Sequence, residues 1–443
     1  MNPPVLPPPL PIQPHAPAPR RGGSGVWVIV AVAAVLVAVL LAPMAVPIYQ
    51  RIQKSARGRQ VKPAPAVQPS KPLTAEQKAA LQKFGEALAA ALTQADDAAV
   101  KRLLDSDGLA DRVFDASTSD FPQAADMRNG FMVGAMKHPG GWLRNIMGND
   151  LKALRVHERD GLPAVVLRLK PEAGGVNYVD IIARPHGDGF RAVDMFTYMY
   201  ASYVSDEMRN LMATMQPASG PGKVAAWLGV AIPDDAMLRH LKTGGDLMNS
   251  GDAAGLLRFS DSLPQKYRDH RMFFMLRMQA LMALSGSGDG KHDPAYRQAL
   301  RSAPDILGKD STTDLLLVDL HLLDNNLEAA EASILRVQEI IAGDPFLKVV
   351  QANIRRMMKD YEGALKLANE AQMEEPDLYD AVDARLSIHV EQKDYPALAE
   401  ELRSFKRTSG VTLDRKSLAE DPQFAEFLAS PEFEEWEKEI AAP

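Results

Sequence analysis

The sequence contains no cysteine among its 443 residues, and aromatic residues make up only 6% of it. The absence of cysteine excludes disulfides, thiolate metal sites and cysteine nucleophiles. The net charge of −7 leaves no basic excess for general binding to nucleic acid, whose phosphates require a basic protein face. The compartment stays open, because a reducing cytosol and a disulfide-free periplasmic domain are both compatible with a chain that lacks cysteine.

Familiar catalytic and cofactor motifs are missing as well. The string Gly220-Pro221-Gly222-Lys223-Val224 lacks the glycine spacing and the Ser or Thr of a Walker loop. The nine histidines are scattered without a ligand pair at metal-binding spacing, and no Gly-x-Ser-x-Gly nucleophile elbow occurs. We therefore expect a non-catalytic protein that needs neither a metal nor a cofactor and does not bind nucleic acid.

The N-terminal part carries three segments without a pattern for a folded core. Residues 1–25 are crowded with proline, which predicts a disordered tail or a ligand for aromatic-lined polyproline grooves. Residues 26–48 carry no charge and are long enough to cross the ~30 Å hydrocarbon core, so we predict a retained single transmembrane helix. Residues 49–73 are first basic and then proline-rich, which predicts a semi-rigid linker.

The orientation of this membrane segment stays open. Two arginines precede it and five basic residues follow it, which favours a cytoplasmic C-terminal body. Many bacterial inner-membrane proteins instead have a short cytoplasmic tail and an exported C-terminal domain, and this plan favours the opposite orientation. Residues 45–50 resemble the stretch after the hydrophobic helix of type IV pilins, which implies an accessory subunit of a pilus or secretion system. The sequence lacks the pilin Gly-Phe processing site before the helix.

Residues 74–216 have the pattern of an α+β domain. Thr74 and Gln77 form a capping-box signature, and a 3.6-residue apolar period predicts helices up to the Pro139-Gly140-Gly141 break. The period then changes to two in four segments separated by glycine-containing turns, which predicts a four-stranded antiparallel sheet. The order and size of these elements resemble a nuclear-transport-factor-two-like cone, a family that includes enzymes and binding proteins.

Two acid–imidazole pairs stand on or near these strands: Asp180 with His186, and His157 with Asp194. One such pair facing an interior cavity would suit general acid–base chemistry. Polar side chains on an antiparallel sheet normally face water, and this is the expectation for both pairs. A small-ligand-binding protein or enzyme using the interior of the 74–216 domain is the alternative function.

A repeat marks the C-terminal half. The tripeptide Lys359-Asp360-Tyr361 returns 34 positions later as Lys393-Asp394-Tyr395, and a weaker copy, Asn325-Asn326-Leu327, stands 34 positions earlier. A helical unit of this length is typical of the tetratricopeptide hairpin. Counted from Pro345, residues Ala352, Ala364, Ala371 and Pro376 occupy the small-residue and proline positions of that family, whereas Arg355 and Ala368 replace its usual aromatic residues.

Residues 236–412, about 40% of the chain, thus resemble the tetratricopeptide-repeat superfamily. The resemblance implies an α-solenoid of about five helical hairpins, after a linker at 217–235 and before capping helices at 413–443. It also implies that the second, fifth, ninth and twelfth positions of each repeat line a concave peptide-binding face. Those positions are Phe346, Val349, Asn353 and Arg356, with Leu315 and Asp319 from the preceding repeat.

The function expected from the whole sequence is therefore a single-pass, membrane-anchored scaffold that binds partner proteins or peptides. The fold class expected is α+β followed by all-α. The identity of the partner is not encoded in any motif of the chain.

Overall fold

The computed structural model describes residues 72–114, 124–147, 150–170, 175–214, 235–268, 270–285, 291–308 and 311–441. They form two compact units that divide between Asp360 and Tyr361. The predicted tail 1–25 and transmembrane helix 26–48 lie outside these residues, as do nearly all of the predicted linkers 49–73 and 217–235. Within the described ranges, no helix combines the length and apolarity needed to cross a membrane.

The α+β part begins with helix α2 (Ala75–Thr93). The Thr74 hydroxyl accepts from the Gln77 backbone N–H at 3.2 Å, and the Gln77 side chain accepts from the Thr74 N–H at 2.9 Å. This reciprocal capping box confirms the predicted helix start. Shorter helices follow: α3 (Asp97–Leu103), α4 (Ser106–Val113), α5 (Ala124–Gly134), the 3₁₀ turn η1 (Ala135–Lys137) and α6 (Pro139–Met147).

The sheet is an antiparallel meander in the order β1-β2-β3-β4-β5. Its strands are β1 (Leu151–Arg159), β2 (Leu162–Leu169), β3 (Asn177–His186), β4 (Gly189–Thr197) and β5 (Ser202–Tyr203). Four strands were expected, and the fifth is an addition. It forms because the 3₁₀ turn η2 (Tyr198–Tyr200) ends at Ala201 in the left-handed conformation, which returns two residues along β4. Two residues are too few to show a period in the sequence.

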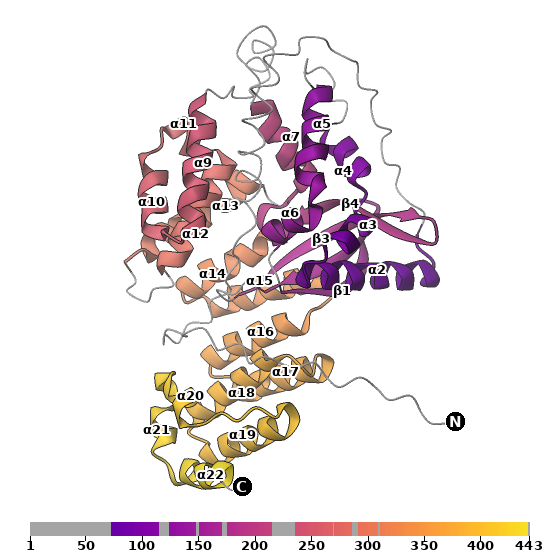
Figure 1. Cartoon of the computed structure of the whole chain (residues 1–443). Helices are drawn as coiled ribbons and strands as arrows, with labels where there is room; N and C mark the ends of the chain where they lie inside the picture. The colour runs from indigo at the N-terminus through magenta and orange to yellow at the C-terminus, as the bar shows by residue number, and fades with distance from the viewer. Residues whose placement is uncertain are drawn as a thin grey trace, which may run out of the picture. The chain divides into compact units, whose positions relative to one another are not determined.

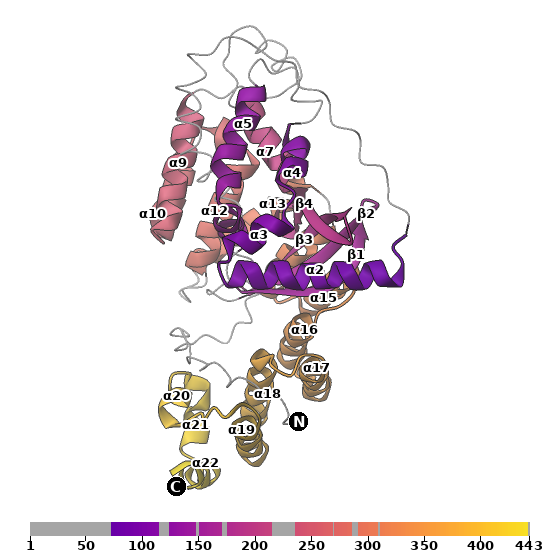
Figure 2. The same cartoon turned by 45° about the vertical axis from the view of Figure 1, so that its right-hand side comes forward.

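Helix α2 crosses one face of this sheet (Figure 2). Its apolar residues Leu81, Leu88 and Leu92 are fully buried, as are Val165 and Leu167 of the sheet. Gly85 lies so close to Val165 that a Cβ at this position would overlap the valine side chain. Glycine is thus required by the close approach of helix and sheet.

The rest of the first unit is helical (Figure 1). After α7 (Val204–Thr214), its elements are α9 (Asp235–Asn249), α10 (Ala253–Ser262), α11 (Gln265–Arg268), α12 (Arg271–Ser285), α13 (Asp293–Leu307), η3 (Ser311–Thr313), α14 (Asp314–Leu323), α15 (Leu327–Ile340) and α16 (Pro345–Met357). Neighbouring helices pack against one another in sequence order, as in α14 with α15 and α15 with α16. This arrangement is consistent with a helical-repeat solenoid.

The sequence repeat corresponds to a repeated turn. Asn325, Lys359 and Lys393, spaced by 34 positions, have positive φ values of 52°, 65° and 55°. The backbone N–H after each one donates to a carbonyl five residues back, at 2.8 to 3.0 Å. This is the Schellman ending of a helix, in which a left-handed residue satisfies the last carbonyls.

The residue that follows the left-handed position starts the next helix in two of these turns. The Asn326 side chain accepts from the Ala329 N–H at 3.2 Å, and that of Asp394 accepts from the Ala397 N–H at 3.1 Å. One short segment therefore ends one helix and caps the next. The repeated tripeptide therefore has a structural role in the turn between helices.

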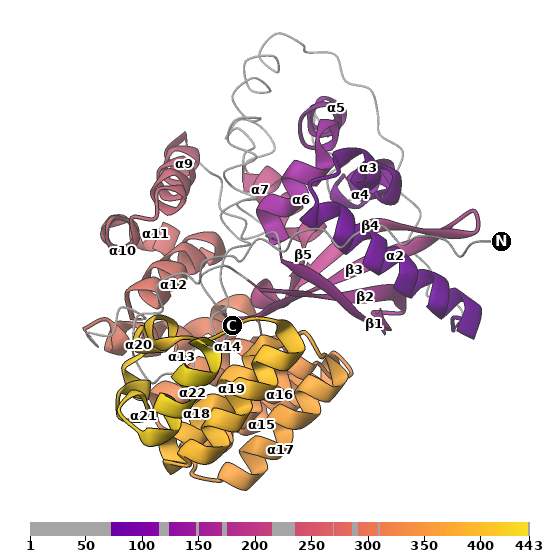
Figure 3. The same ribbon diagram turned by 60° about the horizontal axis from the view of Figure 1, so that its bottom comes forward.

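The second unit contains α17 (Tyr361–Glu374), α18 (Tyr379–Gln392), α19 (Tyr395–Ser409), α20 (Arg415–Ala419), η4 (Pro422–Phe424), α21 (Ala425–Leu428) and α22 (Pro431–Ala441). Helices α18, α19 and α22 lie side by side (Figure 3). Phe427, Phe433 and Trp436 from the last helices pack with Leu398 and Leu402 of α19 in one apolar cluster. The terminal helices thus cover the apolar side of α19.

Candidate functional site

A buried carboxylate occupies the middle of the sheet face opposite α2. Asp180 of β3 pairs with Val166 of β2, whereas the adjacent Val165 faces Gly85 of α2. Successive strand residues point to opposite faces, so Asp180 lies on the other side. Its carboxylate is fully buried, forms an ion pair with Arg159, and lies 2.9 Å from Nε2 of His157.

Asp180 changes the pKa values of the groups around it. The Tyr198 hydroxyl donates to the carboxylate at 3.3 Å, and burial, followed by the charge of Asp180, raises the pKa of Tyr198. Burial alone would lower the pKa of Arg159, but the charges and hydrogen bonds of Asp180 and Tyr198 together outweigh it and the pKa rises. The Arg159 guanidinium also lies 3.8 Å from the centre of the Phe196 ring, a cation–π contact. Arg159 therefore lies between the Asp180 carboxylate, which carries the opposite charge, and the face of the Phe196 ring.

The predicted acid–imidazole pairs are wrong in their partners. His157 is paired with Asp180, and His186 is exposed at the β3–β4 hairpin. Asp180 and His186 are six residues apart on one strand, about 20 Å, and His157 is three strand spacings from Asp194, about 14 Å. Such distances exclude direct contact.

Asp194 instead binds groups from helices that the strand pattern does not include. Its carboxylate accepts from Nε of Arg112 and from the Ser205 hydroxyl, each at 2.6 Å. The expectation that these carboxylates face water is also wrong, because Asp180 and Asp194 are 0% and 1% exposed. Side chains of α4, α7 and η2 contact these two carboxylates.

A third buried carboxylate joins the sheet to helix α16. Asp344, directly before α16, accepts from Nη1 of Arg168 at 2.7 Å and from the Tyr178 hydroxyl at 2.6 Å. It also caps α16 by accepting from the Phe346 N–H at 3.0 Å. Asp344, Arg168 and Tyr178 are at most 4% exposed. Burial, then the charge of Asp344, raises the pKa of Tyr178 well above its ordinary value.

Sequence reasoning missed Asp344 as a site residue, although a local signal exists. An Asp directly before Pro345 is the signature of a helix N-cap followed by proline at the first helical position. That signal predicts the cap. It carries no information about Arg168 and Tyr178, which are 176 and 166 positions away in the chain.

Phe346, the first predicted peptide-binding residue, lies next to this junction. Nζ of Lys170 is 5.1 Å from the centre of its ring, and Cζ of Arg168 is 5.8 Å from it. Both distances suit cation–π contacts. The end of β2 and the residue after it thus cover the start of α16.

The other predicted peptide-binding residues lie on two helices. Leu315 and Asp319 are one turn apart on α14, and both are buried; Asp319 accepts from the Tyr296 hydroxyl at 2.8 Å. On α16, Val349 and Arg356 are buried like Phe346, and Asn353 is half-buried. Asn353 is therefore the residue of this set with the most surface left for a ligand, and the role of the set stays a prediction.

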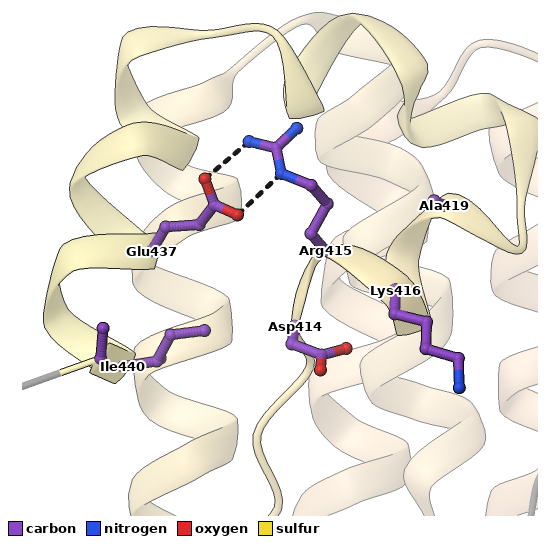
Figure 4. A pocket seen from close by; sticks show the side chains of 7 residues that line it. Asp414, Arg415, Lys416, Ala419, Glu437 and Ile440 are labelled. Atoms are coloured by element: carbon purple, nitrogen blue, oxygen red, sulfur yellow. Dashed lines mark hydrogen bonds and ion pairs between the residues drawn. The ribbon is translucent and has the colours of Figure 1, made fainter.

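A surface depression in the second unit is lined by four charged residues, Asp414, Arg415, Lys416 and Glu437, and by the apolar residues Ala419, Ile440 and Ala441 (Figure 4). Arg415 forms two bonds with the Glu437 carboxylate across it, at 2.7 and 2.6 Å, and this partner lowers the pKa of Glu437. The pair neutralises itself and is exposed to solvent screening. It explains how α20 is held to α22 and offers no free charge to a ligand.

Within the described part of the chain, no group of three His, Asp or Glu side chains is arranged to hold a metal ion. Comparisons with protein-family models, with curated proteins and with solved structures return no match.

Proposed function

We propose that the protein is a single-pass, membrane-anchored scaffold whose tetratricopeptide-like repeats bind partner proteins or peptides without catalysis. The observation that carries the proposal is the shared turn at Asn325, Lys359 and Lys393, with its left-handed residue at 34-residue spacing. Stacked helical hairpins of this length build extended surfaces that bind peptides. The anchor rests on the uncharged run 26–48 of the sequence.

The chemistry of the sheet supports a non-catalytic role. Each of its two buried carboxylates, Asp180 and Asp194, is neutralised by an arginine and accepts from a hydroxyl group. A general base needs free capacity to take a proton from a substrate. Carboxylates that are fully paired instead fix the positions of the elements around them.

A photo-crosslinking residue placed in the full-length, membrane-reconstituted chain tests the proposal. It replaces Asn353 in one variant and Asp188, an exposed hairpin residue of the sheet domain, in the matched control. We expect a discrete, saturable adduct from position 353 and none from position 188. Identical, diffuse labelling from both positions would argue against a specific partner surface on α16.

A second candidate is a small-ligand-binding protein or enzyme, in line with the resemblance of residues 74–216 to the nuclear-transport-factor-two-like cone. The observation in its favour is the pair formed by His157, whose side chain keeps 18% exposure, and the fully buried Asp180. An imidazole oriented by a carboxylate is the arrangement of many general bases. NMR of the His157 ring during titration with a panel of small metabolites tests it. A change confined to this ring would support the candidate, and no change with any member would remove it.

A further inference from the structure

The two faces of the sheet meet their helices through different chemistry. The face toward α2 is apolar, and it lies so close to the helix that only glycine fits at position 85. The opposite side meets α16 through the Asp344 carboxylate and through cations over the Phe346 ring. A buried ion pair contributes little net stability compared with apolar packing, but it specifies one geometry.

The contact between α7 and α12 is also polar, and several of its hydrogen-bonding groups lack partners among the residues that the structure describes. Nε of Arg271 lies 3.4 Å from Oε1 of Glu207 on α7. Both atoms are buried without a hydrogen-bond partner among the described residues, and so is the Tyr200 hydroxyl. Burial, then the charge of Glu207, raises the pKa of Tyr200. Unsatisfied buried groups are costly, so these groups contribute little to holding α12 against α7.

We propose that the sheet is an intramolecular occupant of the partner-binding side of α16, and that a basic peptide segment in a partner displaces it. The inference rests on the proposed function and names the chemistry of the partner. Asp344 selects an arginine, as it holds Arg168, and the Phe346 ring selects a second cation, as it faces Lys170. Arg168-Leu169-Lys170 at the end of β2 shows the spacing that such a segment would present.

Geometry explains why arginine is preferred over lysine at Asp344. Arg168 donates to Oδ1, the same oxygen that accepts from the Phe346 N–H, while Tyr178 takes Oδ2. A planar guanidinium reaches such a crowded carboxylate and still stacks on the neighbouring ring. A displacing segment must therefore supply both the hydrogen bond to Asp344 and the cation beside the Phe346 ring.

The test uses the full-length chain and the variant Arg168→Met, which keeps the length of the side chain and removes its charge. Arg385→Met is the matched control, because the ion pair of Arg385 with Glu401 in the second unit is also largely buried. The probe is a synthetic peptide that copies residues 164–170 (Ala-Val-Val-Leu-Arg-Leu-Lys), with a version carrying Ala at the Arg and Lys positions as its control.

We expect Arg168→Met to raise the hydrogen-exchange rate of α16 roughly 100-fold, as for a buried pair that loses one partner, and to bind the probe at least about tenfold more tightly than wild type. Asp344→Asn in the same background should abolish that binding. Unchanged exchange in α16, or equal binding of both peptides, would overturn the proposal. If Arg168→Met does not fold, Tyr178→Phe, which removes one hydroxyl, decides by the same two measurements. Partner crosslinking from position 353 could still succeed in either case, so the two proposals fail separately.

Discussion

The two faces of the β-sheet are joined to the rest of the first unit in contrasting ways. Toward α2 the sheet presents Val165 and Leu167, and burial of apolar area contributes about 25 cal/mol per Å². On the other face it presents Asp180, Asp194, Arg168 and Tyr178, all buried. The first face contributes stability through close packing, so a change in side-chain volume there should be destabilising. The second supplies a defined geometry, and its stability depends on keeping every partner.

The largest effect is expected where the polar face loses its central charge. Asp344→Ala removes the cap of α16 and leaves Arg168 buried without this carboxylate, so we expect a loss of about 3–5 kcal/mol in the free energy of unfolding. Asp344→Asn can still cap the helix and should lose less. Denaturant unfolding of both variants checks the order. Equal stability of Asp344→Ala and wild type would contradict the role of this residue.

The apolar face should respond to volume. Gly85→Ala places a methyl group against Val165, and we expect a loss of about 1–3 kcal/mol despite the higher helix propensity of alanine. Gly141→Ala in α6 is the matched control, since a Cβ there meets no atom within 4 Å. The control should gain up to about 1 kcal/mol. A stabilised Gly85→Ala variant would show that the two faces do not differ as described.

The repeated turn offers a smaller test that touches neither face. Lys359 holds a left-handed φ of 65°, which costs a residue with a Cβ about 1 kcal/mol compared with glycine. Lys359→Gly should therefore raise the thermal midpoint slightly. Lys366→Gly, inside α17, should lower it, because glycine is unfavourable in a helix interior. The opposite signs of the two changes are the informative result.

Acid should weaken the contact between α7 and α12. His270 precedes Arg271; its Nδ1 accepts from the Met272 N–H at 3.3 Å, and burial lowers its pKa from 6.5. The unfolded chain therefore binds the proton more readily, so this contribution is present above about pH 6.5 and is lost as the pH falls through the lowered folded-state pKa. The protection factors of α12, which correct hydrogen exchange for its intrinsic pH dependence, should fall on acidification in wild type and fall less in His270→Asn. Identical pH profiles would exclude His270 as the cause.

Local features of the fold could be predicted from the sequence because neighbouring residues determine them. The Thr74–Gln77 capping box, the glycine-containing turns between strands and the 34-residue return of a turn each need only a few adjacent side chains. The order of an antiparallel sheet domain before a run of helices follows from the change of apolar period.

The candidate site could not be predicted in the same way. Pairing His157 with Asp180 depends on which strands are neighbours, and Asp194 binds Arg112 of α4, 82 positions earlier in the chain, and Ser205 of α7. The Asp344 contacts bridge more than 160 positions. Periodicity assigns a side chain to a face but not to a partner, and burial turns polar residues expected in water into the links between elements.

Native-state hydrogen exchange of the full-length wild-type chain, measured for α2 and α16 in one experiment, tests the central contrast most directly. We expect α16 to open with a lower free energy than α2, because a polar interface can release without global unfolding. Equal opening free energies for the two helices would show that both faces belong to one inseparable core and would contradict this expectation.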